Sequence, residues 1–333
     1  MKRKKLGKGV LFTFVFVLAI WMTLFILRTP EAIAASETVQ LKLGGSTIGT
    51  LIYMQCAVMT DVWKRYIPDL DITLMATGGS AVNHLPIERG ELDIGTSALP
   101  ADWWVLNGMH FAKTKITNFC SLLPANKAFH HAFTYVDSPI KSWKDLDAKR
   151  VQLGARASAT ALTNEEILQV LGVSPKYFFS TPNEAIDMVK DRRVDAMVYG
   201  VGAPWSGIMD ISKDVQIRLI PMKPEEQEKV AKALPYLAPS VMPSKTYSFQ
   251  NEDYPTVSTY PNLIVRPGLS EELVYKLTKV AWEHWDEVVK GVPAAKWVSA
   301  KDIVYMVAPV HPGAVRYYKE IGINIPDRLI WKK

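Results

Sequence analysis

Residues 41–53 constrain the fold of this chain more than any other stretch. They read Leu-Lys-Leu-Gly-Gly-Ser-Thr-Ile-Gly-Thr-Leu-Ile-Tyr, a short alternating strand that leads through a turn of small polar residues into an apolar-periodic segment. Similar turns occur at residues 77–80 and 154–160. The first N–H groups of a helix lack intrahelical partners and the helix dipole is positive there, so these turns are typical of sites for anionic or polar groups.

Strands and helices alternate around these turns in two separate series. Strands are expected at residues 39–43, 71–75, 92–96, 151–153 and 194–199, and helices at residues 81–89, 161–171 and 183–192, with a further helix after the first turn. This order predicts parallel sheets covered by helices, with ligands outside the carboxyl ends of the strands. We therefore predict an α/β fold with two lobes, lobe 1 at residues 35–135 plus 255–333 and lobe 2 at residues 136–254.

A short internal similarity supports two like lobes. Residues 87–94 and 189–196 both read as a helix end, a basic turn and a strand that begins with an aspartate, Asp93 or Asp195. Both segments stand at the same step of their series. Residues 235–254 have no periodicity and are expected to form a surface loop, and residues 257–266 read as one strand that crosses back to the first lobe.

The amino terminus has the pattern of a secretory signal. A basic segment at residues 2–8 precedes an uncharged apolar run at residues 10–27, and Ala32-Ile33-Ala34 provides a small-x-small cleavage site. We predict a signal peptide at residues 1–34 and export to the periplasm. The apolar run is close to the minimum for a membrane span, so an uncleaved anchor that tethers the protein to the inner membrane is the alternative.

Charge and cysteine content narrow the functional classes. The chain has a net charge of +6, of which the leader contributes +5, so the rest is nearly neutral and nucleic-acid binding is excluded on electrostatic grounds. Cys56 and Cys120 could form a disulfide in an oxidising compartment, and a buried free thiol is the alternative for Cys56. The sequence does not decide between these states.

Several motifs together resemble the TAXI family of extracytoplasmic solute receptors, which serve tripartite (TRAP) transporters. They are Gly-Gly-Ser-Thr-Ile-Gly-Thr at residues 44–50, Thr-Gly-Gly-Ser-Ala-Val-Asn at 77–83, Arg-Gly-Glu-Leu-Asp-Ile-Gly at 89–95, the segment 154–172, Val-Asp-Ala at 194–196 with Pro204, and the tail from His311 to Gly322. The resemblance implies a type II periplasmic binding protein with a hinge between the lobes, a ligand between them and a membrane permease as partner. The chain departs from the family at Ala157 and Ala159, where glycines are usual, which narrows the close approach of a ligand.

The candidate ligand contacts lie in the three turns and at strand ends. Ser46, Thr47 and Thr50 could donate to a ligand, and helix capping is the alternative for the same hydroxyls. Arg156 is suited to a carboxylate, and a solvated loop arginine is its alternative. The full set is Ser46, Thr47, Thr50, Tyr53, Thr77, Gly79, Ser80, Asn83, Arg156, Ser158, Thr160, Tyr199, Gly202 and Trp205.

Catalytic motifs are missing from the sequence. It has no His-Glu-x-x-His, no paired-cysteine motif, no Gly-x-Ser-x-Gly and no phosphate-binding loop with its lysine. His130 and His131 are adjacent on an expected strand, so their side chains should diverge and not form a metal pair. We predict no catalytic residue, no metal and no cofactor. The expected function is a TRAP receptor for a small carboxylate or amino acid, with an ABC-type or sensor-linked binding protein, and then an enzyme on this scaffold, as alternatives.

Overall fold

The computed structural model describes residues 38–156 and 158–332. The predicted leader and Ala157 therefore lie outside the described residues. In the part that is described, no helix is both long and apolar enough to cross a bilayer. Cys56 and Cys120 are both buried free thiols, and burial raises the pKa of Cys56 to about 12.

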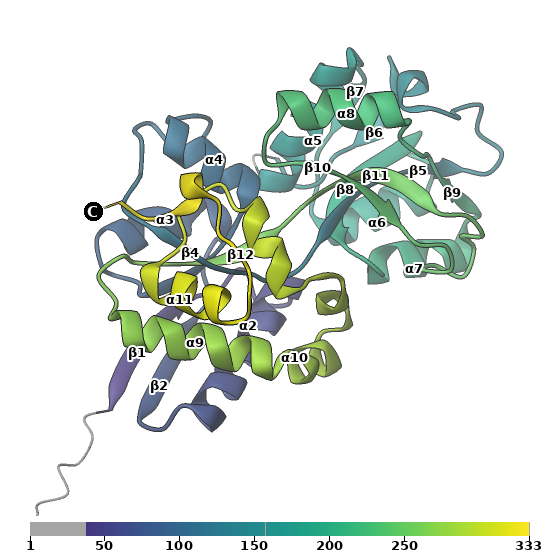
Figure 1. Ribbon diagram of the computed structural model, residues 1–333. Coiled ribbons are helices and arrows are strands. Elements are labelled where there is room, and N and C mark those ends of the chain that lie inside the picture. The colour runs from purple at the N-terminus through teal and green to yellow at the C-terminus, as the bar shows by residue number, and fades with distance from the viewer. Residues whose placement is uncertain (1–37, 157, 333) are drawn as a thin grey trace, which may run out of the picture. The chain divides into compact units, whose positions relative to one another are not determined.

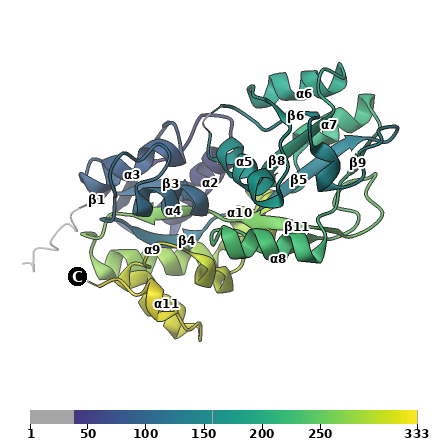
Figure 2. The ribbon, with the colours of Figure 1, turned by 90° about the horizontal axis from the view of Figure 1, so that it is seen from above.

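The first of two sheets has the strand order β2-β1-β3-β12-β4 (Figures 1 and 2). The first three run parallel to one another, and β12 is antiparallel to both β3 and β4. The elements of this part are β1 (Val39–Gly44), α2 (Leu51–Tyr66), β2 (Leu70–Met75), α3 (Ser80–Glu88), β3 (Ile94–Ala98), α4 (Leu99–Asn107), β4 (Cys120–Pro124) and β12 (Pro261–Val265). The strand–helix alternation predicted for the first series is confirmed.

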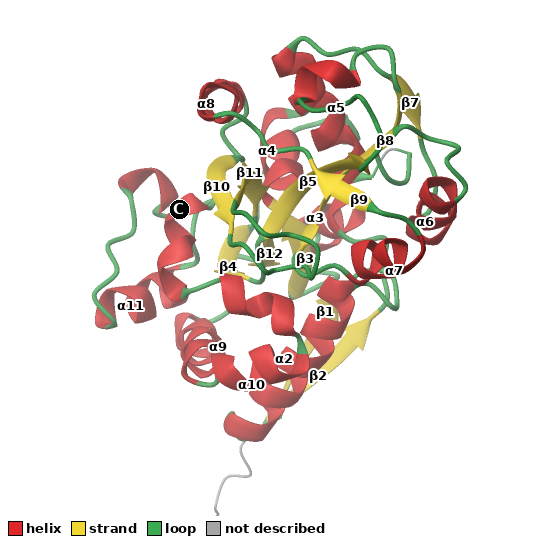
Figure 3. Cartoon of the chain, turned by 90° about the vertical axis from the view of Figure 1, so that its right-hand side faces the viewer, coloured by secondary structure: helices red, strands yellow, loops and turns green. Residues whose placement is uncertain are grey.

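The second sheet has the order β10-β11-β5-β8-β6-β7, with β9 paired to β5 (Figures 1 and 3). Strands β6, β7 and β8 are parallel, and β5 is antiparallel to β8. The elements are β5 (Ala128–Tyr135), η1 (Trp143–Leu146), β6 (Arg150–Gln152), α5 (Ala159–Leu171), β7 (Lys176–Phe178), α6 (Pro182–Lys190), β8 (Ala196–Gly202), α7 (Ser206–Asp214), β9 (Ile217–Leu219), α8 (Pro224–Ala233), β10 (Ala238–Met242) and β11 (Tyr254–Thr259).

The carboxyl-terminal part completes the first sheet with helices. Helices α9 and α10 pack against α2, and α11 packs against α9 (Figures 1 and 2). The elements are α9 (Glu271–Glu283), α10 (Trp285–Gly291), η2 (Pro293–Trp297), η3 (Ala300–Tyr305), α11 (Pro312–Glu320) and η4 (Asp327–Leu329). Buried apolar side chains from these helices, from the first sheet and from β6, β8 and α5 form one core, and α6, α7 and β5 share a second core.

Two sequence expectations about the chain after residue 235 are wrong. The expected surface loop contains β10, which pairs along its length with β11. The expected single strand at residues 257–266 is two strands that break at Tyr260, because β11 pairs in the second sheet and β12 in the first. Strand β5, which falls in the predicted lobe 1, pairs with strands of the second sheet. The exact lobe boundaries stay a prediction.

The two segments that cross between the sheets both lie at the carboxyl ends of the parallel strands. In the first sheet, Pro261 pairs with Ala98 at the end of β3, and Asn262 pairs with Pro124. In the second sheet, Ala128 pairs with Gly202 at the end of β8 and with Thr259. The chain crosses through residues 125–127 and returns through residue 260, so these short segments link the carboxyl edges of the two sheets.

The aspartates of the internal similarity occupy equivalent positions. The Asp93 carboxylate accepts from the backbone N–H of Lys42 at 2.8 Å, and Asp195 accepts from the backbone N–H of Arg150 at 2.8 Å. Each aspartate thereby ties the start of the third parallel strand of its series to the first. The Arg150 guanidinium holds the pKa of Asp195 below its usual range. The two like series predicted from the sequence are therefore also alike in their contacts.

Candidate functional site

The turn after β1 leads directly into α2. Thr50 is the N-cap residue of α2, and its Oγ1 accepts from the Tyr53 N–H at 3.4 Å and donates to the Thr47 carbonyl at 2.8 Å. The Tyr53 ring packs over Gly45, where a Cβ would lie 2.9 Å from Tyr53 Cδ2. Thr47 is exposed and Ser46 half-buried. The Thr50 hydroxyl is thus used in capping, while Ser46 and Thr47 remain open to solvent.

The turn after β2 touches the first turn. The Thr77 N–H donates to the Ser46 carbonyl at 3.2 Å, and Thr77 Oγ1 donates to the Gly45 carbonyl at 3.1 Å. Gly79 has φ +78°, a conformation that favours glycine, and a Cβ there would lie 2.8 Å from Ser46 Oγ. Both the backbone conformation and the lack of space therefore require glycine at this position. Gly79 supplies no side-chain cap to α3, which begins at the half-buried Ser80.

Asn83 lies beneath these two turns and is fully buried. Its Nδ2 donates to the carbonyls of Gly44, Gly45 and Thr96 at 3.2, 3.1 and 2.9 Å. These bonds hold the carboxyl ends of β1 and β3 together. The structure therefore gives Asn83 a supporting position under the turns, without exposed surface from which it could reach a ligand.

The turn of the second sheet leads from β6 into α5. Ser158 caps α5 by accepting from the Ala161 N–H at 3.1 Å, and Thr160 Oγ1 donates to the Gly200 carbonyl at 3.4 Å. The Arg156 guanidinium is exposed and lies 4.2 Å from the centroid of the Phe179 ring. Among the described residues, no carboxylate lies within ion-pair distance of Arg156.

An aromatic stack forms at the end of β8. The Tyr199 and Trp205 rings stack with centroids 4.8 Å apart and an interplanar angle of 28°. Tyr199 packs against Gly154, where a Cβ would lie 3.0 Å from its Cε2, and the Trp205 indole covers the backbone of Gly207. Both aromatic residues are half-buried. The stack therefore borders the turn of the second sheet.

Gly202 brings the start of α2 against the end of β8. A Cβ at Gly202 would lie 2.9 Å from Leu51 Cδ2 and 3.2 Å from the Ala294 Cβ. Gly202 is buried, so its contribution is close packing between elements of the two sheets. This contact places the first turn, which ends at Thr50, beside the strand that carries Tyr199.

Several supporting residues were missed by the sequence reasoning. Asn164 is buried in α5 and donates to the carbonyls of Leu153 and Val198 at 3.3 and 2.8 Å. Its Oδ1 accepts from His130 Nδ1 at 2.7 Å. Burial lowers the pKa of His130 to about 4, so this ring is neutral at physiological pH. No local pattern in the sequence signals these contacts, because the partners are far apart along the chain.

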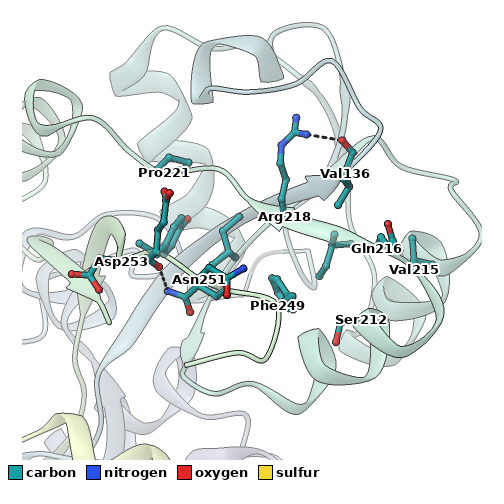
Figure 4. Close-up of a pocket in the computed structure, with 14 residues that line it drawn as sticks. Val136, Ser212, Val215, Gln216, Arg218, Pro221, Phe249, Asn251 and Asp253 are labelled. Atoms are coloured by element: carbon teal, nitrogen blue, oxygen red, sulfur yellow. Dashed lines mark hydrogen bonds between the residues drawn. The ribbon is translucent and has the colours of Figure 1, made fainter. Parts of the chain in front are cut away.

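Two cavities of the described part lie away from the turns. One of about 590 Å³ lies between β9 and the loop at residues 249–254, with Val136, Phe249 and Asn251 among its lining residues (Figure 4). None of the predicted site residues lines it. Val136 follows the end of β5 that is opposite to Ala128. The cavity therefore lies at the end of the second sheet that is distant from the crossing segments.

A buried serine, histidine and aspartate meet in the first sheet without the geometry of a nucleophile. His84 Nε2 lies 2.8 Å from Asp102 Oδ1 and 3.1 Å from Ser97 Oγ, so both groups share one ring nitrogen. In a catalytic triad they would contact opposite nitrogens. All three are buried. Among the described residues, no group of three or more His, Cys, Asp or Glu could hold a metal ion.

Two α/β sheets with like strand order, linked at their carboxyl edges, define the two-lobed fold of type II periplasmic binding proteins. The chain belongs to the NMT1-like family, which matches residues 43–322. Malate-bound MatC of Rhodopseudomonas palustris is 13% identical over 79% of this chain and 90% of that chain, with a TM-score of 0.52. Chloride-bound XAC2383 of Xanthomonas citri is 12% identical over 85% of this chain and 95% of that chain, with a TM-score of 0.51. These likenesses show the shared fold.

Proposed function

We propose that the protein is an exported solute receptor of a TRAP transporter. It captures a small organic anion or amino acid between two closing lobes and presents it to a membrane permease. The observation that carries this proposal is the convergence of helix starts: α2, α3 and α5 all begin at the carboxyl edges that the two crossing segments link. The first N–H groups of such helices are donors suited to a carboxylate.

The two sheets would contact different parts of the ligand. The first presents Ser46, Thr47 and Ser80 beside the uncapped start of α3, which suits a carboxylate. The second presents Ser158, Thr160 and the Tyr199–Trp205 stack, which suits an apolar body. Because the ligand makes both sets of contacts only in the closed state, its binding shifts the hinge equilibrium toward closure.

The assignment to a TRAP transporter rests on the resemblance of residues 44–50, 77–83 and 89–95 to the TAXI family. An ABC-type or sensor-linked receptor would share the fold and the site. Uptake of labelled solute into membrane vesicles of the source cell, measured with and without the added protein, distinguishes a TRAP permease from an ABC transporter. Uptake that depends on a two-component permease and an ion gradient is expected, and dependence on ATP would contradict the TRAP assignment.

The identity of the ligand can be tested on the protein purified from its export compartment. Denaturation should release the bound compound, and we expect mass spectrometry to identify it as a small carboxylate or amino acid. Calorimetry with that compound should then give a stoichiometry of one, and solution scattering should show a more compact protein at saturation. Chemical turnover of the bound compound would contradict a receptor and favour an enzyme on this scaffold.

A further inference from the structure

Beneath the aromatic stack, a buried hydrogen-bond chain links Trp205 at the start of α7, Tyr247 in the turn between β10 and β11, and His131 in β5. The backbone N–H of Trp205 donates to the Tyr247 hydroxyl at 3.0 Å, and this hydroxyl lies 2.9 Å from His131 Nε2. The other ring nitrogen, His131 Nδ1, lies 2.9 Å from the Phe129 carbonyl and 3.3 Å from the Tyr199 carbonyl. The chain therefore connects the backbones of both members of the stack.

The direction of each hydrogen bond follows from the donors and acceptors present. An amide N–H can only donate, so the Tyr247 oxygen accepts from Trp205 and its own hydrogen is left for His131 Nε2. Carbonyl oxygens can only accept, so His131 Nδ1 carries the ring hydrogen and Nε2 is a bare acceptor. Burial lowers the pKa of His131 to about 4, which keeps this tautomer neutral at physiological pH.

The packing around the chain leaves little freedom to the segment between Tyr199 and Trp205. Tyr247 is 2% exposed and its ring stacks on Phe249 at 5.7 Å, while His131 is fully buried. From another side, Trp297 Nε1 donates to the Ala203 carbonyl at 2.6 Å. A segment held at residues 199, 203 and 205 presents its two rings in a single arrangement.

We propose that Tyr247 and His131 are positioning residues that set the selectivity of the cleft for a ligand with an apolar body beside its carboxylate. They do so without touching the ligand, by fixing the spacing and tilt of the Tyr199 and Trp205 rings. This inference rests on the proposed function, since it takes the aromatic stack to be a ligand contact. The first-sheet turns would bind the carboxylate of either type of ligand alike.

The chain offers a matched pair of variants. Tyr247→Phe keeps the buried ring and removes the hydroxyl that joins Trp205 to His131. Tyr254→Phe removes a hydroxyl that is equally buried, accepts from the Ala132 N–H at 2.8 Å and donates to the His130 carbonyl at 3.1 Å. Both variants lose two buried hydrogen bonds, but only the Tyr247 hydroxyl bonds directly to a residue of the stack. Tyr254 reaches the stack only through His131, on which its ring stacks with centroids 6.4 Å apart.

The first measurement needs no ligand. Hydrogen exchange of the peptide that spans residues 199–207, followed by mass spectrometry, should be at least tenfold faster in Tyr247→Phe than in the wild type. Tyr254→Phe should leave that peptide unchanged. Equal exchange in both variants would overturn the positioning role, whatever the protein binds.

The second measurement compares pyruvate with phenylpyruvate, which share a 2-oxo acid head and differ by a ring. We expect the wild type and Tyr254→Phe to bind phenylpyruvate more tightly than pyruvate. In Tyr247→Phe the ratio of the two dissociation constants should fall by about tenfold. An unchanged preference in Tyr247→Phe would overturn the inference and leave the proposed receptor intact. Failure of the wild type to bind any carboxylate or amino acid would contradict the proposed function itself.

Discussion

The two sheets have the same arrangement of strands but differ in how the N-termini of their helices are capped. The order β2-β1-β3-β12 in the first matches β7-β6-β8-β5 in the second, with the fourth strand antiparallel in each. Yet α3 has Gly79 as its N-cap residue and therefore no side-chain cap, whereas the equivalent helix α6 begins with a capping box of Thr181 and Glu184. In α6 the Glu184 carboxylate already occupies the position that a ligand anion would take.

This difference separates two recognition tasks that a like fold would otherwise share. The first sheet keeps two touching turns of small residues and an open helix start, which are features of a site for a charged head group. In the second sheet both helix starts carry a side-chain cap, Ser158 for α5 and Thr181 for α6. The turn before α5 faces the Tyr199–Trp205 stack, which suits a ligand body. The predictions below test whether the sheets differ in this way, beginning with the largest effect.

We expect acid to lower the stability of the second sheet more than that of the first. The pKa values of His130 and His131 are lowered by burial to about 4, below the value of 6.5 for an exposed histidine, so the unfolded chain binds more protons below pH 6.5. Their stabilising contribution is complete above pH 6.5 and is lost as the pH falls toward 4. From pH 7 to 5 the loss is about 2 kcal/mol for each histidine.

Urea unfolding at pH 7, 6 and 5 measures this loss. The variant His130→Gln should show a smaller drop between pH 7 and 5 than the wild type, whatever its stability at pH 7. Hydrogen exchange should locate the acid-induced opening in β5 and β8 before β1 and β3. Opening that begins in the first sheet would refute the expected contrast.

Asn83 and Asn164 perform the same task in the two sheets and provide the next comparison. Each ties together the ends of two parallel strands through its amide, Asn83 for β1 and β3 and Asn164 for β6 and β8. Substitution of either by alanine leaves buried carbonyls unpaired and should lower the free energy of unfolding by roughly 3 kcal/mol. Calorimetric titration of the folded variants should show the greater loss of carboxylate affinity in Asn83→Ala. Equal losses would mean that both sheets bind the head group.

Gly79 tests the contact between the two turns of the first sheet. Alanine there is strained by the positive φ and meets Ser46 Oγ, whereas Gly90 has φ +72° with no atom near its missing Cβ. Gly90→Ala should cost about 1 kcal/mol of stability through backbone strain. Gly79→Ala should cost more, because its φ of +78° with ψ of −148° lies in a region essentially open only to glycine and its Cβ would meet Ser46 Oγ. Only Gly79→Ala should also weaken ligand binding, by roughly tenfold in a calorimetric titration. Loss of affinity in Gly90→Ala as well would point to a general effect of destabilisation.

The sequence predicted the features of both sheets that depend on local pattern. Alternation and small-residue turns located the strands and helices of the two series, and adjacency predicted that His130 and His131 diverge, toward Asn164 and Tyr247 in the structure. It could not predict the break at Tyr260, because pairing partners more than a hundred residues away decide which sheet each half joins. Tyr247 was missed for a related reason: it lies in a stretch without periodicity, and its significance comes from contacts with Trp205 and His131.

Arg156 provides the test with the smallest expected effect. Its guanidinium is exposed and packs on the Phe179 ring, so any attraction for a ligand carboxylate is weakened by solvent. Arg192 serves as the control, since it is also exposed and lies 4.5 Å from the centroid of the Tyr135 ring, at the opposite end of β5 from the crossing segment. Unlike Arg156, it also pairs with Asp137 at 3.0 Å. We expect Arg156→Ala to weaken carboxylate binding by about threefold at low ionic strength, with less effect in 0.5 M salt, and Arg192→Ala to leave it unchanged. If Arg156→Ala has no effect at either salt concentration, charge recognition belongs to the first sheet alone. A loss much above tenfold would instead mean that the second sheet also binds the carboxylate, which would contradict the separation of tasks between the sheets.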